Sequence, residues 1–198
     1  MKRLSVTSIL SALLSIPIFF GIYVEFFSIQ ELNLSITLAL IFGIFSLLIV
    51  GKILNKYGFT KDDFELIKTH TVINALNRKN WGVLLFFFPL TMIMEELIFR
   101  YYLIGFLVST LQQKIGISIF ISAVFFSLYH IHTWFSYKSL IILFINLSFT
   151  LLLGFFLGFI FFTLGIIFCI VAHYILALYL WYSIFRNIKK VELIDPNF

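Results

Sequence analysis

The sequence predicts an all-helical fold, a polytopic membrane bundle of about six transmembrane helices with both termini in the cytoplasm. Of the 198 residues, 62% are hydrophobic and 12% are charged, whereas soluble domains average roughly 45–50% and about 25%. Long apolar stretches recur along the whole chain, and the basic residues cluster between them on one side. These observations exclude soluble, disordered, collagen-like and coiled-coil classes, and they indicate a single integral membrane domain over residues 1–198.

The apolar stretches mark the membrane-spanning helices. A span needs about 20 predominantly apolar residues, because hydrocarbon does not tolerate unpaired backbone polar groups. Six segments meet this requirement, at roughly 6–28, 34–54, 82–110, 116–136, 139–162 and 165–186. The first is too long for a signal peptide and lacks a clear small-residue cleavage site, so we interpret it as an uncleaved span. In the fifth, Gly154 and Gly158 have the small-xxx-small spacing that favours close helix packing.

The distribution of Lys and Arg predicts the orientation. With the amino terminus inside, only Lys114 of the 14 basic residues falls outside, and Arg100 lies within a span. The others face the cytoplasm, as the positive-inside rule requires: Lys2, Arg3, Lys52, Lys56, Lys61, Lys68, Arg78, Lys79, Lys138, Arg186, Lys189 and Lys190. Aromatic residues fall near the same interface, namely Trp81, Trp134, Tyr137, Trp181 and Tyr182. The net charge of +5 is therefore assigned to membrane topology, and no nucleic-acid partner is predicted.

A basic cytoplasmic loop at about residues 55–81 joins the second and third predicted spans. Thr60 and Asp63 have capping-box spacing, and apolar residues from Phe64 onwards would give the following helix an apolar side. An interfacial helix attracted to anionic lipid and a plain solvated loop both fit this pattern. His70, in the same loop, is predicted to be solvated.

Ionisable side chains inside the spans mark the candidate site. A charged group near the bilayer centre costs about 2.5–3.5 kcal/mol, so each one needs a physical reason. Glu95, Glu96 and Arg100 all lie in the third predicted span. Glu96 and Arg100 are four residues apart and can pair on one helix face. Glu95 points about 100° away and is left available for chemistry.

Two histidines from other spans are predicted to lie at the same depth. His130 and His173 fall, like Glu95, within roughly four residues of the midpoints of their spans. One polar pocket would then contain carboxylates and imidazoles from three helices. Such a set fits either water activation by Glu95 or a metal site formed by Glu95, His130 and His173. Cys169, four residues before His173, is interpreted as a small packing residue.

Other intramembrane protease motifs are absent from the sequence. No His is followed by Glu, so the His-Glu-x-x-His zinc motif is missing. Gly-x-Ser-x-Gly and Gly-x-Gly-Asp motifs are missing too, and no Asp lies within a predicted span. These patterns exclude a paired-aspartate mechanism and give no support to a serine nucleophile.

The polar motifs resemble those of the CPBP family, which comprises CAAX proteases, bacteriocin-processing enzymes and Abi proteins. The resemblance covers a core of about residues 82–180 and depends on three motifs: Glu95-Glu96-x-x-x-Arg100, Phe126-x-x-x-His130, and His173 in a later helix. It implies an intramembrane endopeptidase.

The resemblance also implies roles for the individual residues. Glu95 would be the general base that activates water, aided by His130. Glu96 and Arg100 would hold the geometry and charge of the site. His173 would polarise the scissile carbonyl or stabilise the oxyanion. The family is called metalloprotease, yet its mechanism is also described as glutamate-dependent, so a divalent metal such as Zn and a metal-free mechanism are both alternatives.

One position departs from the family pattern. The family's third motif ends in Asn or Asp four residues after its His, where this chain has Ala177. Losing one oxyanion donor typically lowers the rate about 10²–10³-fold. Asn146, from the fifth predicted span, is a candidate replacement. Without such a donor the protein would be slow or catalytically silent.

The predicted function is hydrolysis of a peptide bond in a membrane-associated peptide or protein, in the cytoplasmic membrane of a bacterium. The resemblance implies bacteriocin or signal-peptide processing, or self-immunity. The alternatives are a catalytically silent binding or immunity protein and a small transporter, since buried Glu and His also serve ion pathways. The predicted partners are the lipid bilayer and a peptide or protein substrate.

Overall fold

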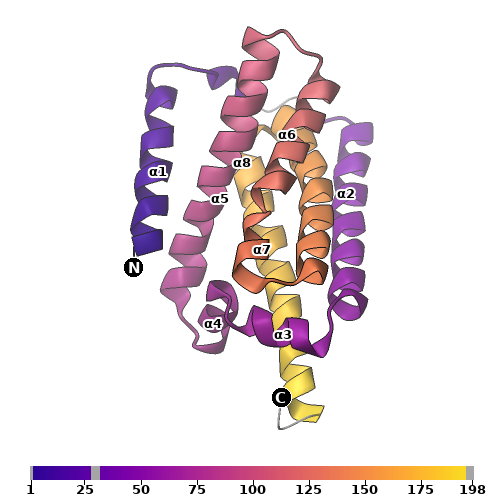
Figure 1. Ribbon diagram of the computed structural model, residues 1–198. Coiled ribbons are helices and arrows are strands. Elements are labelled where there is room, and N and C mark those ends of the chain that lie inside the picture. The colour runs from indigo at the N-terminus through magenta and orange to yellow at the C-terminus, as the bar shows by residue number, and fades with distance from the viewer. Residues whose placement is uncertain (1, 28–31, 195–198) are drawn as a thin grey trace.

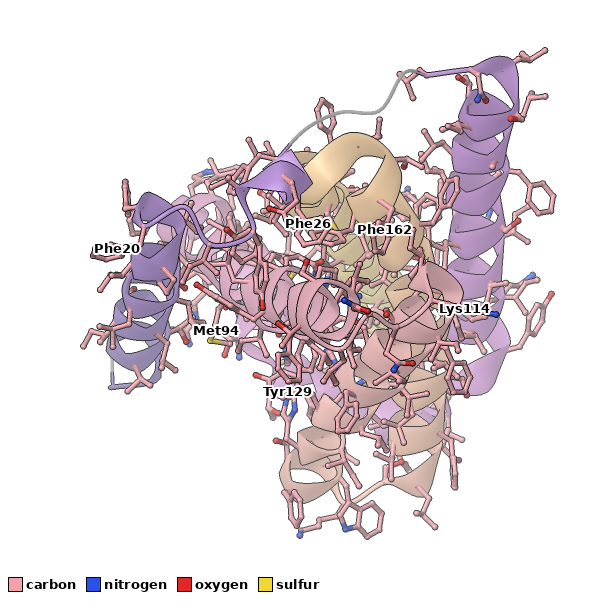
Figure 2. The ribbon with its side chains drawn as sticks, turned by 90° about the horizontal axis from the view of Figure 1, so that it is seen from above. Phe20, Phe26, Met94, Lys114, Tyr129 and Phe162 are labelled. Carbon is pink, nitrogen blue, oxygen red and sulfur yellow. The ribbon has the colours of Figure 1, made fainter. Side chains whose placement is uncertain are left out.

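The computed structural model describes residues 2–27 and 32–194, which contain helices and no strand. The helices that run along the bundle are α1 (Lys2–Phe19), α2 (Leu34–Ile53), α5 (Phe88–Glu96), α6 (Ile115–Tyr129) and α8 (Leu140–Ile194). In Figure 1, α1 lies outside α5 on one side of the molecule, α2 lies on the opposite side, and α8 runs between them. The same arrangement is seen from above in Figure 2, where Phe26 and Phe162 lie close together, with ring centroids 6.0 Å apart. The predicted all-helical membrane bundle is therefore confirmed.

Three helical segments among the described residues are long and apolar enough to cross a membrane: Leu34–Gly58, Ile115–Tyr137 and Leu140–Leu193. The last consists of two helices that meet at Gly165, where φ is 80° and ψ is 176°. This break separates the fifth and sixth predicted spans. In Figure 1, α1 begins and α8 ends toward the part of the bundle where the short helices α3 (Lys61–Lys68) and α4 (Thr71–Asn77) lie. The number of crossings and the side that faces the cytoplasm stay predictions.

The first predicted span, 6–28, was wrong as a single helix. α1 ends at Phe19, and a short 3-10 helix follows at Val24–Phe27. Gly21, with φ of 77°, ends α1 in the left-handed conformation that glycine adopts without steric cost. The N–H of Ile22 donates to the carbonyl of Pro17 at 3.3 Å, which closes the turn. The Tyr101 hydroxyl then donates to the carbonyl of Ile22, so the turn is held against the central helix.

The third predicted span, 82–110, is a helix of mixed winding. Its α-helical part, α5, is preceded by π-helical turns at Val83–Phe87 and followed by others at Leu97–Ile104 and Phe106–Thr110. Such wide turns rotate the side chains that follow them relative to a regular α-helix, and they occur often at functional sites. The change of winding begins directly after Glu96.

The fourth predicted span, 116–136, is interrupted where a continuous helix was expected. α6 ends at Tyr129, and the short helix α7 (His132–Tyr137) follows. The ring Nδ1 of His130 donates to the carbonyl of Phe126 at 2.9 Å, because a carbonyl oxygen can only accept. The side chain of His130 therefore caps the carbonyl end of α6.

Gly154 and Gly158 bring α8 into close contact with α6. A Cβ atom on Gly154 would lie 3.0 Å from the Ala123 backbone, and one on Gly158 would lie 2.7 Å from the side chain of Ile119. The predicted close packing of the small-xxx-small motif is therefore present. This contact holds α6, and with it Phe126, against the first half of α8.

We expect Gly154→Ala to lower the free energy of unfolding by about 1–3 kcal/mol, because the added methyl group meets backbone atoms that cannot rotate away. Gly116→Ala is the matched control, since a Cβ there has no atom within 4 Å. Melting in detergent, followed with a thiol-reactive dye on the single Cys169, gives the comparison. Equal melting temperatures for the two variants would contradict the packing argument.

The loop between the second and third predicted spans folds into α3 (Lys61–Lys68) and α4 (Thr71–Asn77). The predicted capping box of Thr60 and Asp63 is present. Asp63 also accepts a hydrogen bond from the Ser139 hydroxyl at 2.6 Å. Burial opposes ionisation of this carboxyl, but the hydrogen bonds from Ser139 and Thr60 outweigh that effect and lower the pKa of Asp63.

The apolar side of α3 and α4 packs on protein, so the plain solvated loop was wrong, whereas the attraction of this segment to anionic lipid stays a prediction. Phe64, Ile67 and Ile73 pack in one cluster with Ile184 and Ile188 of α8. An amphipathic helix buries its apolar face wherever apolar surface is available, and here the end of α8 supplies that surface.

His70, predicted to be solvated, is also part of this contact. Its ring stacks on Trp181 of α8, with centroids 3.8 Å apart. Its Nδ1 accepts a hydrogen bond from the N–H of Val72, which caps α4. Stacking on α8 and capping of α4 are therefore the roles of this imidazole.

Candidate active site

The candidate active site lies where the end of α5 faces the second half of α8. Glu95 and Glu96 are the last two residues of α5, and Arg100 lies in the π-helical turn that follows. His173 lies in α8, after the break at Gly165. The exposed fractions of these residues are 5%, 0%, 0% and 3% in that order, so protein encloses all four. Isolated charges are costly in such surroundings, and each therefore needs a partner.

Glu96 is the centre of a polar network. Its Oε1 lies 2.7 Å from Nδ1 of His173 and 3.2 Å from a guanidinium nitrogen of Arg100. Its Oε2 accepts a hydrogen bond from the Cys169 thiol at 2.9 Å. An ionised carboxylate can only accept, so Nδ1 of His173 carries the hydrogen. The predicted pair of Glu96 and Arg100 is present, and Glu96 also orients the imidazole.

Glu95 lies on the other side of the His173 ring. Its Oε2 is 3.8 Å from Nε2 of His173, which is too long for a direct hydrogen bond. This oxygen is buried and has no hydrogen-bond partner among the described residues. A water molecule or a substrate oxygen can bridge two groups at such a separation. The imidazole thus lies between a carboxylate that is hydrogen-bonded to it and one that is available.

The ring of Phe126, on α6, packs against three members of the site. The guanidinium carbon of Arg100 lies 4.1 Å from its centroid, a cation–π contact. The rings of His173 and His130 meet it at steep angles, with centroids 5.5 and 4.9 Å away. His130 therefore adjoins the cluster through Phe126, and no hydrogen bond or ion pair in the described part of the chain joins it to Glu95.

The structure thus brings Glu95, Glu96, Arg100 and His173 into direct proximity and places His130 at the edge of the group. Cys169 belongs to the site, although its sequence surroundings indicated packing alone. The signal for it was its spacing, because a residue four positions before His173 lies on the same helix face. Only a fold that places Glu96 opposite that face makes the spacing meaningful.

Ala177, where the resembled family carries Asn or Asp, lies in apolar surroundings. It packs on a cluster that contains Val72, Leu84 and Met92. Asn146 lies in the first half of α8, and no hydrogen bond in the described ranges links its side chain to His173. Among the described residues, neither position 177 nor position 146 therefore supplies an amide donor to His173.

A metal ion would need at least three protein ligands facing one point. Within the described ranges, no three His, Cys, Asp or Glu side chains are arranged in this way. Glu95 and His173 approach each other, whereas His130 is directed to the Phe126 carbonyl. The donor set does not fit a metal in this geometry, and metal dependence stays a prediction.

One family of known proteins matches the part of the chain that contains the candidate site. Residues 77–179, just over half of the chain, match the family described as type II CAAX prenyl endopeptidase Rce1-like. The chain belongs to this Rce1-like family. No curated protein and no solved structure matches it.

Membership of the Rce1-like family implies a membrane-associated endopeptidase that acts on a peptide substrate. The matched region contains every residue of the candidate site, from Glu95 to His173, while α1 and α2 lie outside it. The predicted CPBP resemblance is therefore confirmed at the level of the family.

Proposed function

We propose that this Rce1-like protein hydrolyses a peptide bond of a membrane-associated peptide, with Glu95 as general base and His173 as the group that stabilises the oxyanion. The observation that carries the proposal is that Nε2 of His173 faces, at 3.8 Å, an oxygen of Glu95 that has no hydrogen-bond partner among the described residues. A reacting water needs an acceptor for its proton, and the attacked carbonyl needs a donor for its developing charge. The two facing groups supply both.

The steps balance without a further reactant. Glu95 takes a proton from water, and the hydroxide oxygen forms a bond to the scissile carbonyl carbon. The carbonyl oxygen becomes an oxyanion that accepts a hydrogen bond from Nε2 of His173, for which His173 carries a hydrogen on both nitrogens. The C–N bond then breaks, and Glu95 gives its proton to the leaving amine.

The remaining residues position these two groups. Glu96 accepts the Nδ1 hydrogen of His173, which holds the imidazole ring so that its Nε2 faces Glu95. Arg100 offsets the charge of Glu96, and the Cys169 thiol occupies its second oxygen. His130, with its hydrogen on Nδ1, presents Nε2 as an acceptor that would assist in holding the water.

A second candidate function, a catalytically silent binding or immunity protein, is favoured by the apolar surroundings of Ala177. The two functions differ in their dependence on Glu95, because a binding protein does not need a general base. A Glu95→Gln variant that retains the cellular function would favour binding.

Bacteriocin leader peptides and signalling peptides are the candidate substrates of the enzyme, with self-immunity as a candidate role.

The test is cleavage of a peptide panel by the purified protein in liposomes, with products identified by mass spectrometry. The panel contains a farnesylated CAAX-type peptide, the same peptide without the prenyl group, and apolar leader-type peptides. We expect cleavage of at least one peptide, and we expect His173→Ala to lower its rate about 10²–10³-fold because the oxyanion loses its donor. A wild-type rate in His173→Ala, or no cleavage of any peptide, would contradict the proposal.

A further inference from the structure

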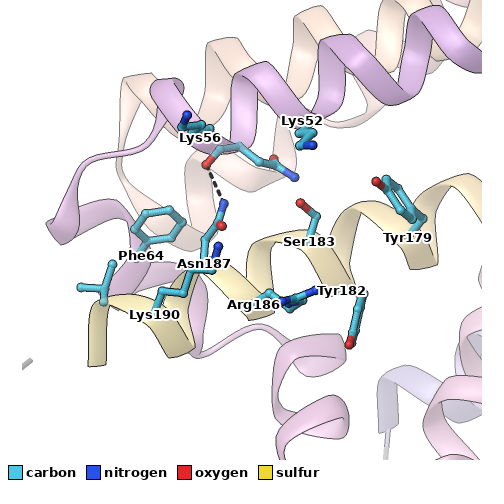
Figure 3. Close-up of a pocket in the computed structure, with 11 residues that line it drawn as sticks. Lys52, Lys56, Phe64, Tyr179, Tyr182, Ser183, Arg186, Asn187 and Lys190 are labelled. Carbon is cyan, nitrogen blue, oxygen red and sulfur yellow. Dashed lines mark hydrogen bonds between the residues drawn. The ribbon is translucent and has the colours of Figure 1, made fainter. Parts of the chain in front are cut away.

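A basic groove lies between the end of α2 and the second half of α8 (Figure 3), and no residue of the candidate active site lines it. Its volume is about 600 Å³. The Asn187 side chain donates to the Asn55 carbonyl at 3.1 Å, and the Asn55 side chain donates to the Leu180 carbonyl at 3.4 Å. These bonds hold the two helices together, so the groove is a built feature of the fold.

The charge of the groove has one sign. Lys52 and Lys56 come from the end of α2 and the turn after it, and Arg186 and Lys190 come from α8. The described residues that line the groove include no acidic side chain. In each pair the two cations are four residues apart, a spacing at which like charges destabilise a helix. Two such pairs on opposite walls give the groove a positive potential that attracts an anion.

The surroundings of the groove are those of a membrane interface. Tyr179 and Tyr182 line it beside the cations. Ile49 and Ile53 on α2 and Ile175 on α8 are exposed by 57%, 51% and 58%, which leaves apolar surface leading away from the charged part. A ligand that fits this order of groups has an anionic head and an apolar tail.

We propose that the groove binds the phosphate headgroup of an anionic phospholipid, with its acyl chains along the apolar surfaces of α2 and α8. Basic pockets between transmembrane helices bind such headgroups, and a phosphate accepts several hydrogen bonds from Lys and Arg at once. A soluble phosphate would use the cations but not the exposed isoleucines. The lipid is therefore the occupant that uses both halves of the site, and its binding does not depend on the proposed peptidase activity.

Native mass spectrometry of the protein in neutral detergent tests this binding, because no charged membrane surface is then present. Dioleoyl phosphatidylglycerol, dioleoyl phosphatidylcholine and inorganic phosphate are the probes. We expect the wild type to retain phosphatidylglycerol in preference to phosphatidylcholine. Lys56→Ala/Arg186→Ala removes two cations and is expected to weaken phosphatidylglycerol binding about 30-fold.

Two further variants separate specific binding from general charge and from misfolding. Lys56→Arg/Arg186→Lys keeps both charges in the groove and is expected to bind as the wild type does. Arg78→Ala/Lys114→Ala removes the same number of charges from exposed positions that do not line the groove, and is expected to leave binding within about 2-fold.

Several outcomes would overturn the proposal. They are unchanged phosphatidylglycerol binding in Lys56→Ala/Arg186→Ala, equal loss in the charge-preserving variant or in Arg78→Ala/Lys114→Ala, and equal retention of phosphatidylcholine by the wild type. Displacement of the lipid by inorganic phosphate at equal concentration would assign the groove to a soluble anion instead.

Discussion

Glu95→Gln is expected to lower the rate of peptide cleavage about 10²–10⁴-fold, the usual contribution of a general base. The amide keeps the size of the side chain but cannot take a proton from water. The oxygen that is lost has no hydrogen-bond partner among the described residues, so the fold should tolerate the change. The measurement is the initial rate on whichever panel peptide the wild type cleaves, with the melting temperature recorded in parallel.

Glu65→Gln is the matched control for this variant. Glu65 lies on α3, its side chain is 47% exposed, and it pairs with Lys68 outside the candidate site. We expect its rate to stay within about 2-fold of the wild type, because an exposed ion pair contributes little. If Glu95→Gln and Glu65→Gln cleave equally fast, the assignment of Glu95 as general base is wrong.

Arg100→Met is expected to lower the free energy of unfolding by about 3–5 kcal/mol, the cost of breaking a buried ion pair from one side. Met fills much of the space but leaves Glu96 without the cation that lies 3.2 Å from it, and Phe126 loses its cation–π contact. The expected drop in melting temperature is on the order of 10 °C, measured with the thiol-reactive dye. The single Cys169 is buried in the folded protein, so dye labelling reports unfolding.

The double variant Glu96→Gln/Arg100→Met should recover part of this loss, because position 96 then no longer carries a buried charge that has lost its cation. Lys138→Met is the control, since it also removes a cation near a phenylalanine ring, 5.4 Å from Phe135, but at an exposed position. A drop for Lys138→Met as large as for Arg100→Met, or a double variant less stable than Arg100→Met, would show that the buried pair is not the source of the effect.

Several elements were predictable because their signals are local. The capping box at Thr60 and the glycine contact at Gly154 each depend on residues a few positions apart, and both are present. The break at Gly165 falls where two predicted spans were separated. The end of α1 was not predictable in this way. It depends on the turn at Gly21, which brings the Ile22 carbonyl to the hydroxyl of Tyr101, a residue far away in the sequence.

The surface on which the amphipathic helices α3 and α4 pack was not predictable from the sequence either. The periodicity of the sequence predicted their apolar faces. It could not show whether these faces would pack on lipid or on the end of α8, because both present apolar surface. The contact of Ile67 with the α8 cluster and the stacking of His70 on Trp181 are long-range packing.

In the candidate site, the ionisable residues were identifiable because hydrocarbon penalises them wherever they occur, and Glu96 with Arg100 pair within one helix. Two features depend on how α8 lies against α5: which nitrogen of His173 bonds to Glu96, and which oxygen of Glu95 has no partner among the residues that the structure describes. Cys169 became a member of the site for the same reason. The cost of burying a charge and the spacing of residues along a helix depend only on the segment that contains them, so both can be read from the sequence. The assembly of a donor, an acceptor and a thiol from distant segments depends on helix packing, which no local pattern encodes.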